Sequence, residues 1–448
     1  MIRHIHIAQA GASLTPAEIA ENFSDLHPPL TPAQASAESG RCLYCYDAPC
    51  LRACPTGLDI PAFIRQIASR NVLGAAETIL SANILGGTCA RACPTEVLCE
   101  GACVVNKTEG EPVRIGLLQR HAVDTLMQRG GAHPFSRAPE TGRNLAVVGA
   151  GPAGLSFAHK AAMLGHRVTV YEARQKPGGL NEYGLAAYKM VDAFAEREVE
   201  FLLGVGGISV RHGVMLGRDV TLDRLRARHD AVFLSVGLGD AVALGVPGET
   251  LPGVRSALSF IDDLRQARDK AAVKVGRNVI VIGGGNTAID AAVQAKRLGA
   301  NNVTMVYRRG PEHMSATAWE QDLARLNGVT LTFWAMPAAI EGDAAVIALR
   351  FERSRLVDGR LRGCDEFFTL PADQVLVAAG QKLHDAAGLF VEHGKLQVDS
   401  QYRTSLPDVY AGGDCIRPGE DLTVQAVEDG KRAALAVHAA LSAQSKGA

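Results

Sequence analysis

Eight of the ten cysteines lie within about sixty residues near the start of the sequence. They are Cys42, Cys45, Cys50, Cys54, Cys89, Cys93, Cys99 and Cys103, while Cys364 and Cys415 stand apart. A disulfide framework is typical of small secreted chains, whereas this chain has 448 residues. Thiolates are soft ligands that suit zinc and iron–sulfur clusters. The dense group therefore predicts a metal or cluster site.

The cysteine spacing favours iron–sulfur clusters over zinc. Cys42-x2-Cys45-x4-Cys50-x3-Cys54-Pro55 is close to the ferredoxin run, in which three cysteines hold one cluster and the fourth ligates another. Zinc sites use paired C-x2-C knuckles, but the second group here is spaced x3, x5 and x3. Eight thiols also match the ligand count of two [4Fe–4S] clusters. We predict two such clusters.

A glycine-rich turn lies between an apolar strand pattern and a helix pattern. It consists of Gly149, Ala150, Gly151, Pro152, Ala153 and Gly154. Its glycines allow a tight turn and the close approach of a pyrophosphate, which faces the N-terminus of the helix. Glu172 ends the next strand pattern, where a carboxylate can bond ribose hydroxyls. The segment predicts a dinucleotide site.

Two more segments resemble flavoprotein motifs and indicate FAD. A Gly178-Gly179 pair follows the ribose acid, and VYAGGDC resembles a second FAD motif. That motif would place Gly413 and Asp414 on the ribityl or phosphate side, with Thr423 opening a helix aimed at the flavin ring. The remaining predicted FAD contacts are Leu180, Lys189 and Leu216.

A second glycine turn predicts a nicotinamide nucleotide site. It contains Gly283, Gly284, Gly285, Asn286 and Thr287, and Ala379 and Gly380 follow a later strand pattern of the same region. Arg308 and Arg309 stand where an NAD-type acid is expected, and arginine there can accept a 2′-phosphate. This chemistry favours NADPH, but the choice between NADH and NADPH stays open.

These motifs divide the chain into domains. We expect a helical domain for two [4Fe–4S] clusters over 1–140, an FAD domain over 141–241 and 384–448, and an NAD(P) domain over 242–383. The second FAD motif follows the nicotinamide motif, so the NAD(P) domain is inserted in the FAD domain. The predicted fold class is α/β, with an α-helical N-terminal iron–sulfur domain and two Rossmann-like domains.

The composition excludes several classes of function. Lys and Arg number 46 against 47 Asp and Glu, so no charge excess indicates nucleic acid or an anionic membrane. No apolar run reaches the roughly 18 residues of a membrane helix, and the first residues lack a secretory h-region. We expect a cytoplasmic protein without nucleic-acid or membrane partners. No side-chain nucleophile or acid–base pair stands out, so we predict no catalytic side chain.

Three segments, RCLYCYDAPCLRACPTGLDIPAFI, CPTEVLCEGAC and VRIGLLQ, resemble the N-terminal part of dihydropyrimidine dehydrogenase and the glutamate synthase small subunit. The first resemblance implies cluster one on Cys42, Cys45, Cys50 and Cys103, and cluster two on Cys54, Cys93, Cys99 and Gln119. Glutamate synthase subunits resemble the same pattern, but the resemblance implies Glu in them at the position of Gln119. Cys89 would then be a small buried residue without a role in ligation. The choice between Cys89 and Gln119 as the eighth ligand stays open.

The same resemblance bears on both nucleotide sites. Lys189 stands where mammalian-type relatives carry Arg, which implies a role beside the flavin; a solvated lysine is the alternative. In relatives that resemble this chain and bind NADPH, a further Arg stands at the position that Ser315 occupies here. Its absence from this chain weakens the predicted preference for NADPH.

The resemblance spans nearly the whole chain and implies the FAD/iron–sulfur subunit of bacterial NAD-dependent dihydropyrimidine dehydrogenase. Electrons would pass from NADH or NADPH through FAD and two clusters to an FMN/iron–sulfur partner, in a heterotetramer that reversibly reduces uracil or thymine to 5,6-dihydropyrimidines. The alternative is an NAD(P)H-to-acceptor oxidoreductase like the glutamate synthase small subunit. A non-catalytic flavin-binding scaffold is a third hypothesis, which bleaching of the flavin by NADH or NADPH would exclude.

Overall fold

The computed structural model describes residues 5–6, 13–417 and 419–446, which form two compact units. The smaller unit contains the described residues up to Leu26, together with Tyr183–Val191 and Asp240–Lys382. The larger unit contains His27–Glu182, Asp192–Gly239 and the described residues from Leu383 onward. Two unit boundaries lie within two residues of the expected ones at 241 and 383, but the division has no break near residue 140.

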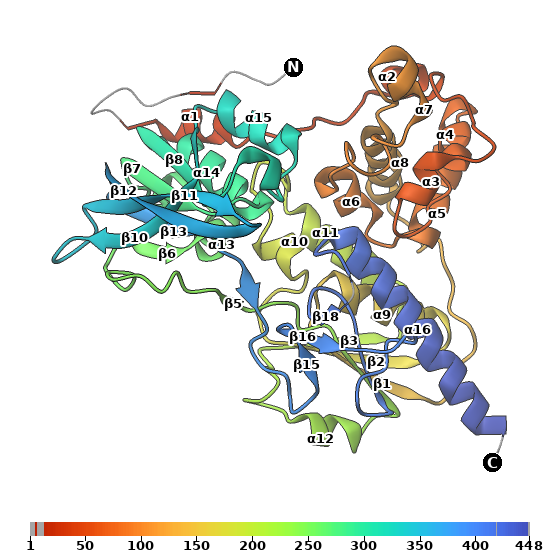
Figure 1. Ribbon diagram of the computed structural model, residues 1–448. Helices are drawn as coiled ribbons and strands as arrows, with labels where there is room; N and C mark the ends of the chain where they lie inside the picture. Colours follow the sequence, from red (N-terminus) through yellow and green to blue (C-terminus); the bar gives the residue numbers. More distant parts are fainter. Residues whose placement is uncertain (1–4, 7–12, 418, 447–448) are drawn as a thin grey trace. The chain divides into compact units, whose positions relative to one another are not determined.

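The larger unit begins with a group of short helices that carries the cysteines (Figure 1). The first of them starts at a capping box, in which the Thr31 hydroxyl accepts the Gln34 N–H and the Gln34 side chain accepts the Thr31 N–H. Asp59 caps a later helix through the Ala62 N–H at 3.0 Å. The helices are α2 (Pro32–Ser39), α3 (Pro49–Ala53), α4 (Ile60–Ala68), α5 (Val72–Ala82), α6 (Gly86–Ala92), α7 (Val104–Glu109) and α8 (Ile115–Arg129).

A parallel sheet follows these helices in the same unit. Its strand order is β17-β4-β1-β2-β3. The last strand in sequence, β17, pairs with β4 although the whole smaller-unit segment from Asp240 to Lys382 lies between them. The insertion predicted from the order of the motifs is therefore present. The strands are β1 (Asn144–Val148), β2 (Arg167–Glu172), β3 (Ile208–His212), β4 (Ala231–Leu234) and β17 (Val409–Ala411).

Helices and short strands complete the larger unit around this sheet. The long C-terminal helix α16 packs along α9, which follows β1. The helices are α9 (Pro152–Met163), α10 (Leu180–Tyr183), α11 (Phe194–Leu203), α12 (Leu222–Arg226) and α16 (Thr423–Lys446), and a small sheet contains β15 (Val391–Glu392), β16 (Lys395–Gln397) and β18 (Ile416–Arg417).

One hydrophobic core joins the cysteine-bearing helices to the parallel sheet. Ile79 on α5 and Leu118 on α8 belong to the same cluster of buried side chains as Phe157 on α9 and Phe233 on β4. Phe157 and Phe233 are stacked, with ring centroids 4.3 Å apart. The helical segment and the predicted FAD domain therefore pack as one body.

The smaller unit contains a second parallel sheet of the same type. Its order is β6-β13-β7-β8-β9, and an antiparallel sheet β10-β11-β12 lies in the same unit. The two short strands β5 and β14 pair where the chain enters and leaves this unit.

The strands of the smaller unit are β5 (Asp240–Ala241), β6 (Val254–Ser256), β7 (Asn278–Ile282), β8 (Asn302–Tyr307), β9 (Thr330–Phe333), β10 (Ala335–Glu341), β11 (Ala348–Val357), β12 (Arg360–Pro371), β13 (Gln374–Val377) and β14 (Gln381–Lys382). Its helices are α1 (Pro16–Asn22), α13 (Ala257–Gln266), α14 (Asn286–Arg297) and α15 (Ala318–Leu326), with 3-10 turns at Lys270–Ala272 and Pro311–His313.

In the described part of the chain, no single helix is both long and apolar enough to cross a membrane. Only α5 and α6 taken together meet the requirements of length and composition, and these two helices are bent by 89° relative to each other.

Phe157→Ala tests the shared core. Both stacked rings are fully buried, so truncation leaves a cavity that should cost about 3–5 kcal/mol. We expect a lower apparent melting temperature by differential scanning fluorimetry at a fixed scan rate. Phe390→Ala is the control, because that side chain is 60% exposed. Equal melting temperatures for the two variants would contradict the contribution of the stacked rings to this core.

Candidate functional site

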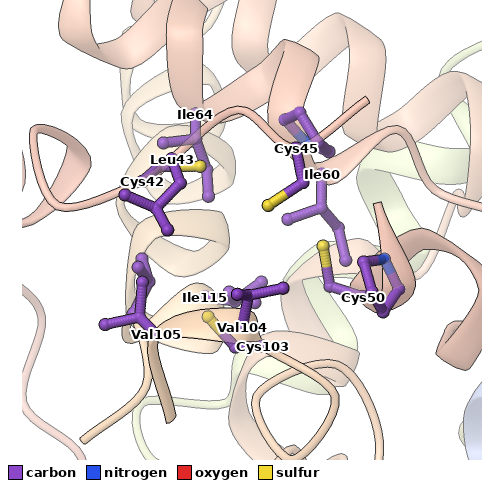
Figure 2. Close-up of a pocket in the computed structure, with 13 residues that line it drawn as sticks. Cys42, Leu43, Cys45, Cys50, Ile60, Ile64, Cys103, Val104, Val105 and Ile115 are labelled. Atoms are coloured by element: carbon purple, nitrogen blue, oxygen red, sulfur yellow. The ribbon is translucent and has the colours of Figure 1, made fainter. Parts of the chain in front are cut away.

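Four predicted cluster ligands surround one pocket in the larger unit. Figure 2 shows the sulfur atoms of Cys42, Cys45, Cys50 and Cys103 directed toward a common space. Cys42 and Cys45 lie in the loop before α3, Cys50 lies in α3, and Cys103 immediately precedes α7. The fold therefore brings together the four residues that the resemblance assigns to cluster one.

This pocket has the character that a cluster requires. The apolar side chains of Ile60, Ile64 and Ile115 line it beside the thiols. No three His, Cys, Asp or Glu side chains among the described residues converge on a point suited to one metal ion. The thiols instead surround a space, as a cube of iron and sulfide needs. Burial raises the pKa of Cys50 to about 11, so cluster assembly must displace its proton.

A second set of thiols lies in the same helical segment. The pKa of Cys93 is raised by a hydrogen bond with Cys89, by burial and by the nearby thiols of Cys99 and Cys54. Burial, Glu100 and Cys54 likewise raise the pKa of Cys99. The three cysteines assigned to cluster two are therefore electrostatic neighbours.

The two candidates for the eighth ligand contact α6, which contains Cys89 and ends at Cys93. The Cys89 thiol is buried, and its sulfur accepts a hydrogen bond from Asn83 Nδ2 at 3.1 Å. Gln119 is also buried, and its Nε2 donates to the Gly86 carbonyl at 2.6 Å. Within the described chain, Gln119 Oε1 accepts no hydrogen bond. The eighth ligand, Cys89 or Gln119, stays a prediction.

The first glycine turn is shaped by contacts that exclude side chains. A Cβ at Gly149 would lie 2.4 Å from the Ser235 carbonyl oxygen, and one at Gly154 would lie 2.0 Å from the Gly149 oxygen. A Cβ at Gly179 would lie 2.7 Å from Gly151 Cα. The two glycine segments thus pack backbone against backbone at the start of α9.

The N-terminus of α9 is available to an anionic group. Its first residues are Pro152 and Ala153, and no side chain caps it at Gly151. The Gly178 N–H donates to the Ala150 carbonyl at 2.7 Å, which joins the second glycine segment to the turn. Free N–H groups at a helix start bind phosphate, so this cradle fits the pyrophosphate of FAD.

Glu172 lies at the carboxyl end of β2, beside the turn that follows β1. Its buried carboxylate accepts the Ala150 and Arg174 N–H groups, both at 2.7 Å. Leu216 follows β3, the next strand along, and Leu180 opens α10. Glu172 therefore lies at the carboxyl edge of the sheet, where such folds bind nucleotides.

The second FAD motif reaches the same sheet edge through β17. Gly413 adopts φ 77°, and a Cβ there would lie 2.9 Å from that of Ala153. Burial raises the pKa of Asp414 to about 6, and its carboxylate makes no hydrogen bond among the described residues. Thr423 begins α16 and donates to Asn181 Oδ1 at 2.9 Å. Two segments far apart in sequence thus frame one cradle.

The second glycine turn lies in the smaller unit between β7 and α14. A Cβ at Gly283 would lie 2.4 Å from the Ala378 oxygen, and one at Gly284 would lie 2.4 Å from the Tyr307 ring. The start of α14 at Gly285 has no side-chain cap, and its first turn contains Asn286 and Thr287. Asn286 Oδ1 is buried without a hydrogen bond. This orphaned oxygen and the free helix start fit a bound dinucleotide.

Two arginines stand at the same edge of this sheet. Arg308 and Arg309 follow β8, and neither guanidinium has an ion pair or hydrogen-bond partner among the described residues. Arg309 Nε is buried and unpaired. Ser315 lies near Gly285, while Ala379 and Gly380 follow β13, which pairs with β7. Unpaired cations beside a nucleotide cradle suit a phosphate.

Lys189 has partners that the sequence analysis missed. It lies in the smaller unit, where its buried Nζ contacts Asp290 at 2.8 Å and also Glu320. Burial alone lowers the pKa of this lysine, but the two carboxylates outweigh burial and raise it. It is therefore not a solvated lysine, and its role beside the flavin stays a prediction. The one available signal was an acid, Asp290, among the apolar residues from Ala288 to Val293 in α14.

Cys89→Ser and Cys99→Ser distinguish the two assignments of cluster ligands. We expect Cys89→Ser to keep its full iron content, because Gln119 completes the second site. We expect Cys99→Ser to lose about half of the iron, because one of two clusters loses a thiolate. Iron analysis of anaerobically purified protein measures both outcomes. Iron loss from the Cys89 variant would make Cys89 the ligand.

Comparisons with known proteins agree with this set of sites. The model for pyridine nucleotide-disulphide oxidoreductases matches residues 143–430, and the model for dihydropyrimidine dehydrogenase domain II, 4Fe-4S cluster, matches residues 19–131. The chain is 35% identical to the NAD-dependent dihydropyrimidine dehydrogenase subunit PreT of Escherichia coli O157:H7, over 93% of this chain and 97% of that one. It is 34% identical to the glutamate synthase [NADPH] small chain of Escherichia coli K12, over 92% of each chain.

Solved structures share the fold at lower sequence identity. FprA from Mycobacterium tuberculosis in complex with NADPH is 22% identical, with a TM-score of 0.59 over 69% of this chain and 86% of that one. Thioredoxin reductase from T. acidophilum is also 22% identical, with a TM-score of 0.55 over 67% of this chain and 99% of that one. The predicted fold class and family resemblance are confirmed. The chain belongs to the pyridine nucleotide-disulphide oxidoreductase family, as an electron-transferring flavoprotein with an FAD/NAD(P)-binding fold and an N-terminal 4Fe-4S domain.

Proposed function

We propose that this chain is the electron-input subunit of a dihydropyrimidine dehydrogenase. It oxidises NADH or NADPH and delivers single electrons through two [4Fe–4S] clusters to an FMN/iron–sulfur partner that reduces uracil or thymine. The expected assembly is a cytoplasmic heterotetramer. The observation that carries this proposal is Gln119, a buried side chain whose Nε2 donates to the Gly86 carbonyl at the start of α6, the helix that ends at Cys93. The resemblance to glutamate synthase subunits implies Glu at this position.

The residues of the chain bind and orient the cofactors. When bound, FAD converts a two-electron hydride into single electrons, which the clusters carry one at a time. Backbone N–H groups at the start of α9 would hold the pyrophosphate, and Glu172 would orient the ribose. The start of α14 would hold the nicotinamide nucleotide. The apolar wall of the first cysteine pocket would exclude water from a bound cluster.

The second candidate is an NADPH-dependent oxidoreductase like the glutamate synthase small chain. The unpaired guanidinium groups of Arg308 and Arg309 favour it, because they suit the 2′-phosphate that distinguishes NADPH from NADH. The relative whose name includes NADPH is a glutamate synthase chain, whereas the PreT relative is named as NAD-dependent.

Uracil-dependent oxidation of NADH and NADPH tests the proposed function. The complex is purified anaerobically through a tag on this chain and assayed at 340 nm with and without uracil. We expect oxidation that requires uracil and a co-purifying FMN protein. Flavin bleaching without any uracil dependence, despite an intact partner, would contradict the proposal and favour the second candidate. No bleaching by either nucleotide would indicate a non-catalytic scaffold.

Arg308→Ala and Arg309→Ala test the nucleotide preference. If these side chains bind a 2′-phosphate, each loses charge-assisted hydrogen bonds worth about 1.5–3 kcal/mol. The KM for NADPH should therefore rise about 10–100-fold, while the KM for NADH stays the same. Flavin reduction by each nucleotide measures both constants, and Arg360→Ala on β12 is the control. An equal rise for NADH would show that neither arginine reads the 2′-phosphate.

A further inference from the structure

A buried carboxylate from α11 reaches the first turn of α6. Glu198 Oε1 accepts the Thr88 N–H at 3.0 Å, and Oε2 bonds the Thr88 hydroxyl. The Glu198 side chain is almost completely inaccessible to solvent. Burial raises its pKa to about 7 although both Thr88 groups donate to it. Burying a carboxylate is costly, so its contacts need a structural reason.

The N–H groups in the first turn of α6 need hydrogen-bond acceptors from outside the helix. The first N–H groups of a helix lack partners within the helix, and the residue before α6, Leu85, provides no side-chain cap. Gly86 and Gly87 occupy the next two positions and carry no side chains. Glu198 therefore caps α6 from a different helix.

Close packing makes this arrangement specific. A Cβ at Gly87 would lie 2.4 Å from Phe194 Cζ and 2.8 Å from Glu198 Oε1. Arg91 holds the opposite side of the turn, since its Nη1 donates to the Gly87 carbonyl at 2.9 Å and its guanidinium lies 3.4 Å from the centre of the Phe194 ring. The turn is thus held through its N–H groups by Glu198 and through a carbonyl by Arg91.

The same turn orients the candidate ligand of the second cluster. The Gly86 carbonyl accepts the Gln119 Nε2–H at 2.6 Å. An amide group is planar, so fixing its nitrogen also fixes the direction of its oxygen. Any rotation of the first turn of α6 would move the Gly86 carbonyl and redirect Gln119 Oε1.

We propose that Glu198 is a positioning residue for the second [4Fe–4S] cluster. By capping α6 it fixes the Gly86 carbonyl, which in turn aims the Gln119 oxygen at the iron. The inference rests on the assignment of Gln119 as a ligand in the proposed function. It concerns the isolated chain and needs neither the partner nor uracil.

The test compares Glu198→Ala, Glu198→Gln and Gln119→Ala in the anaerobically purified full chain. The readouts are iron content and the EPR spectrum after chemical reduction. We expect Glu198→Ala to shift or abolish the EPR signal of the second cluster, as we expect of Gln119→Ala. If the second cluster is lost, the iron content should fall to about half of that in the unaltered chain. Glu198→Gln should restore the signal, because its amide oxygen can still accept the Thr88 N–H. Glu200→Gln, an exposed acid on the same helix, is the matched control.

The outcomes separate the two assignments. A native signal in Glu198→Ala, with a changed one in Gln119→Ala, would overturn the positioning role alone. Native signals in both variants would overturn the ligand assignment and the positioning role that rests on it. If Glu198→Ala fails to fold, as judged by its flavin content and the signal of the first cluster, Glu198→Asp provides the measurement. Its shorter side chain withdraws the carboxylate from the Thr88 N–H, so an unchanged second signal would again overturn the proposal.

Discussion

The shared hydrophobic core of the larger unit is the constraint on which the candidate electron path depends. Single-electron carriers are useful only if the protein holds them at fixed positions. Packing α5 and α8 against the same buried side chains as α9 and β4 fixes the cysteine loops relative to the FAD-type cradle. Protein interiors are packed as densely as organic crystals. The cysteine loops and the FAD-type cradle, joined by one such core, therefore move little relative to each other. A linker between two independent domains would not provide this rigidity.

The two nucleotide cradles apply one physical solution twice. Each places a glycine turn between a buried parallel strand and an uncapped helix, and in each a neighbouring backbone or ring occupies the space that a side chain would need. They differ in the side chain at the next strand end. Glu172 in the larger unit suits ribose hydroxyls, whereas Arg308 in the smaller unit suits a phosphate. This difference in charge is the basis on which we predict different ligands for the two cradles.

Buried charges mark the places where local packing departs from a simple apolar core. Lys189 has two carboxylate partners in the smaller unit, and Glu198 has two hydrogen-bond donors from one residue in the larger unit. Removing one partner of such a group leaves the other unsatisfied in a region of low dielectric constant. Both arrangements therefore specify geometry: the first orders the segment that follows the Gly178-Gly179 pair, and the second orders the turn that contacts Gln119.

The sequence by itself determined the sites that are continuous along the chain. The two glycine turns, the ribose acid, the arginine pair and the cysteine group are recognisable because each depends on local spacing, and the order of the motifs was enough to predict the insertion. Only the tertiary structure decided which distant residues meet. The family resemblance implied that Cys103 joins the pocket of Cys42, but nothing in the sequence indicated the partners of Lys189 and Glu198, which come from other helices. Packing between elements has no fixed spacing in sequence, so neither the shared core nor the cap on α6 could be predicted from local patterns.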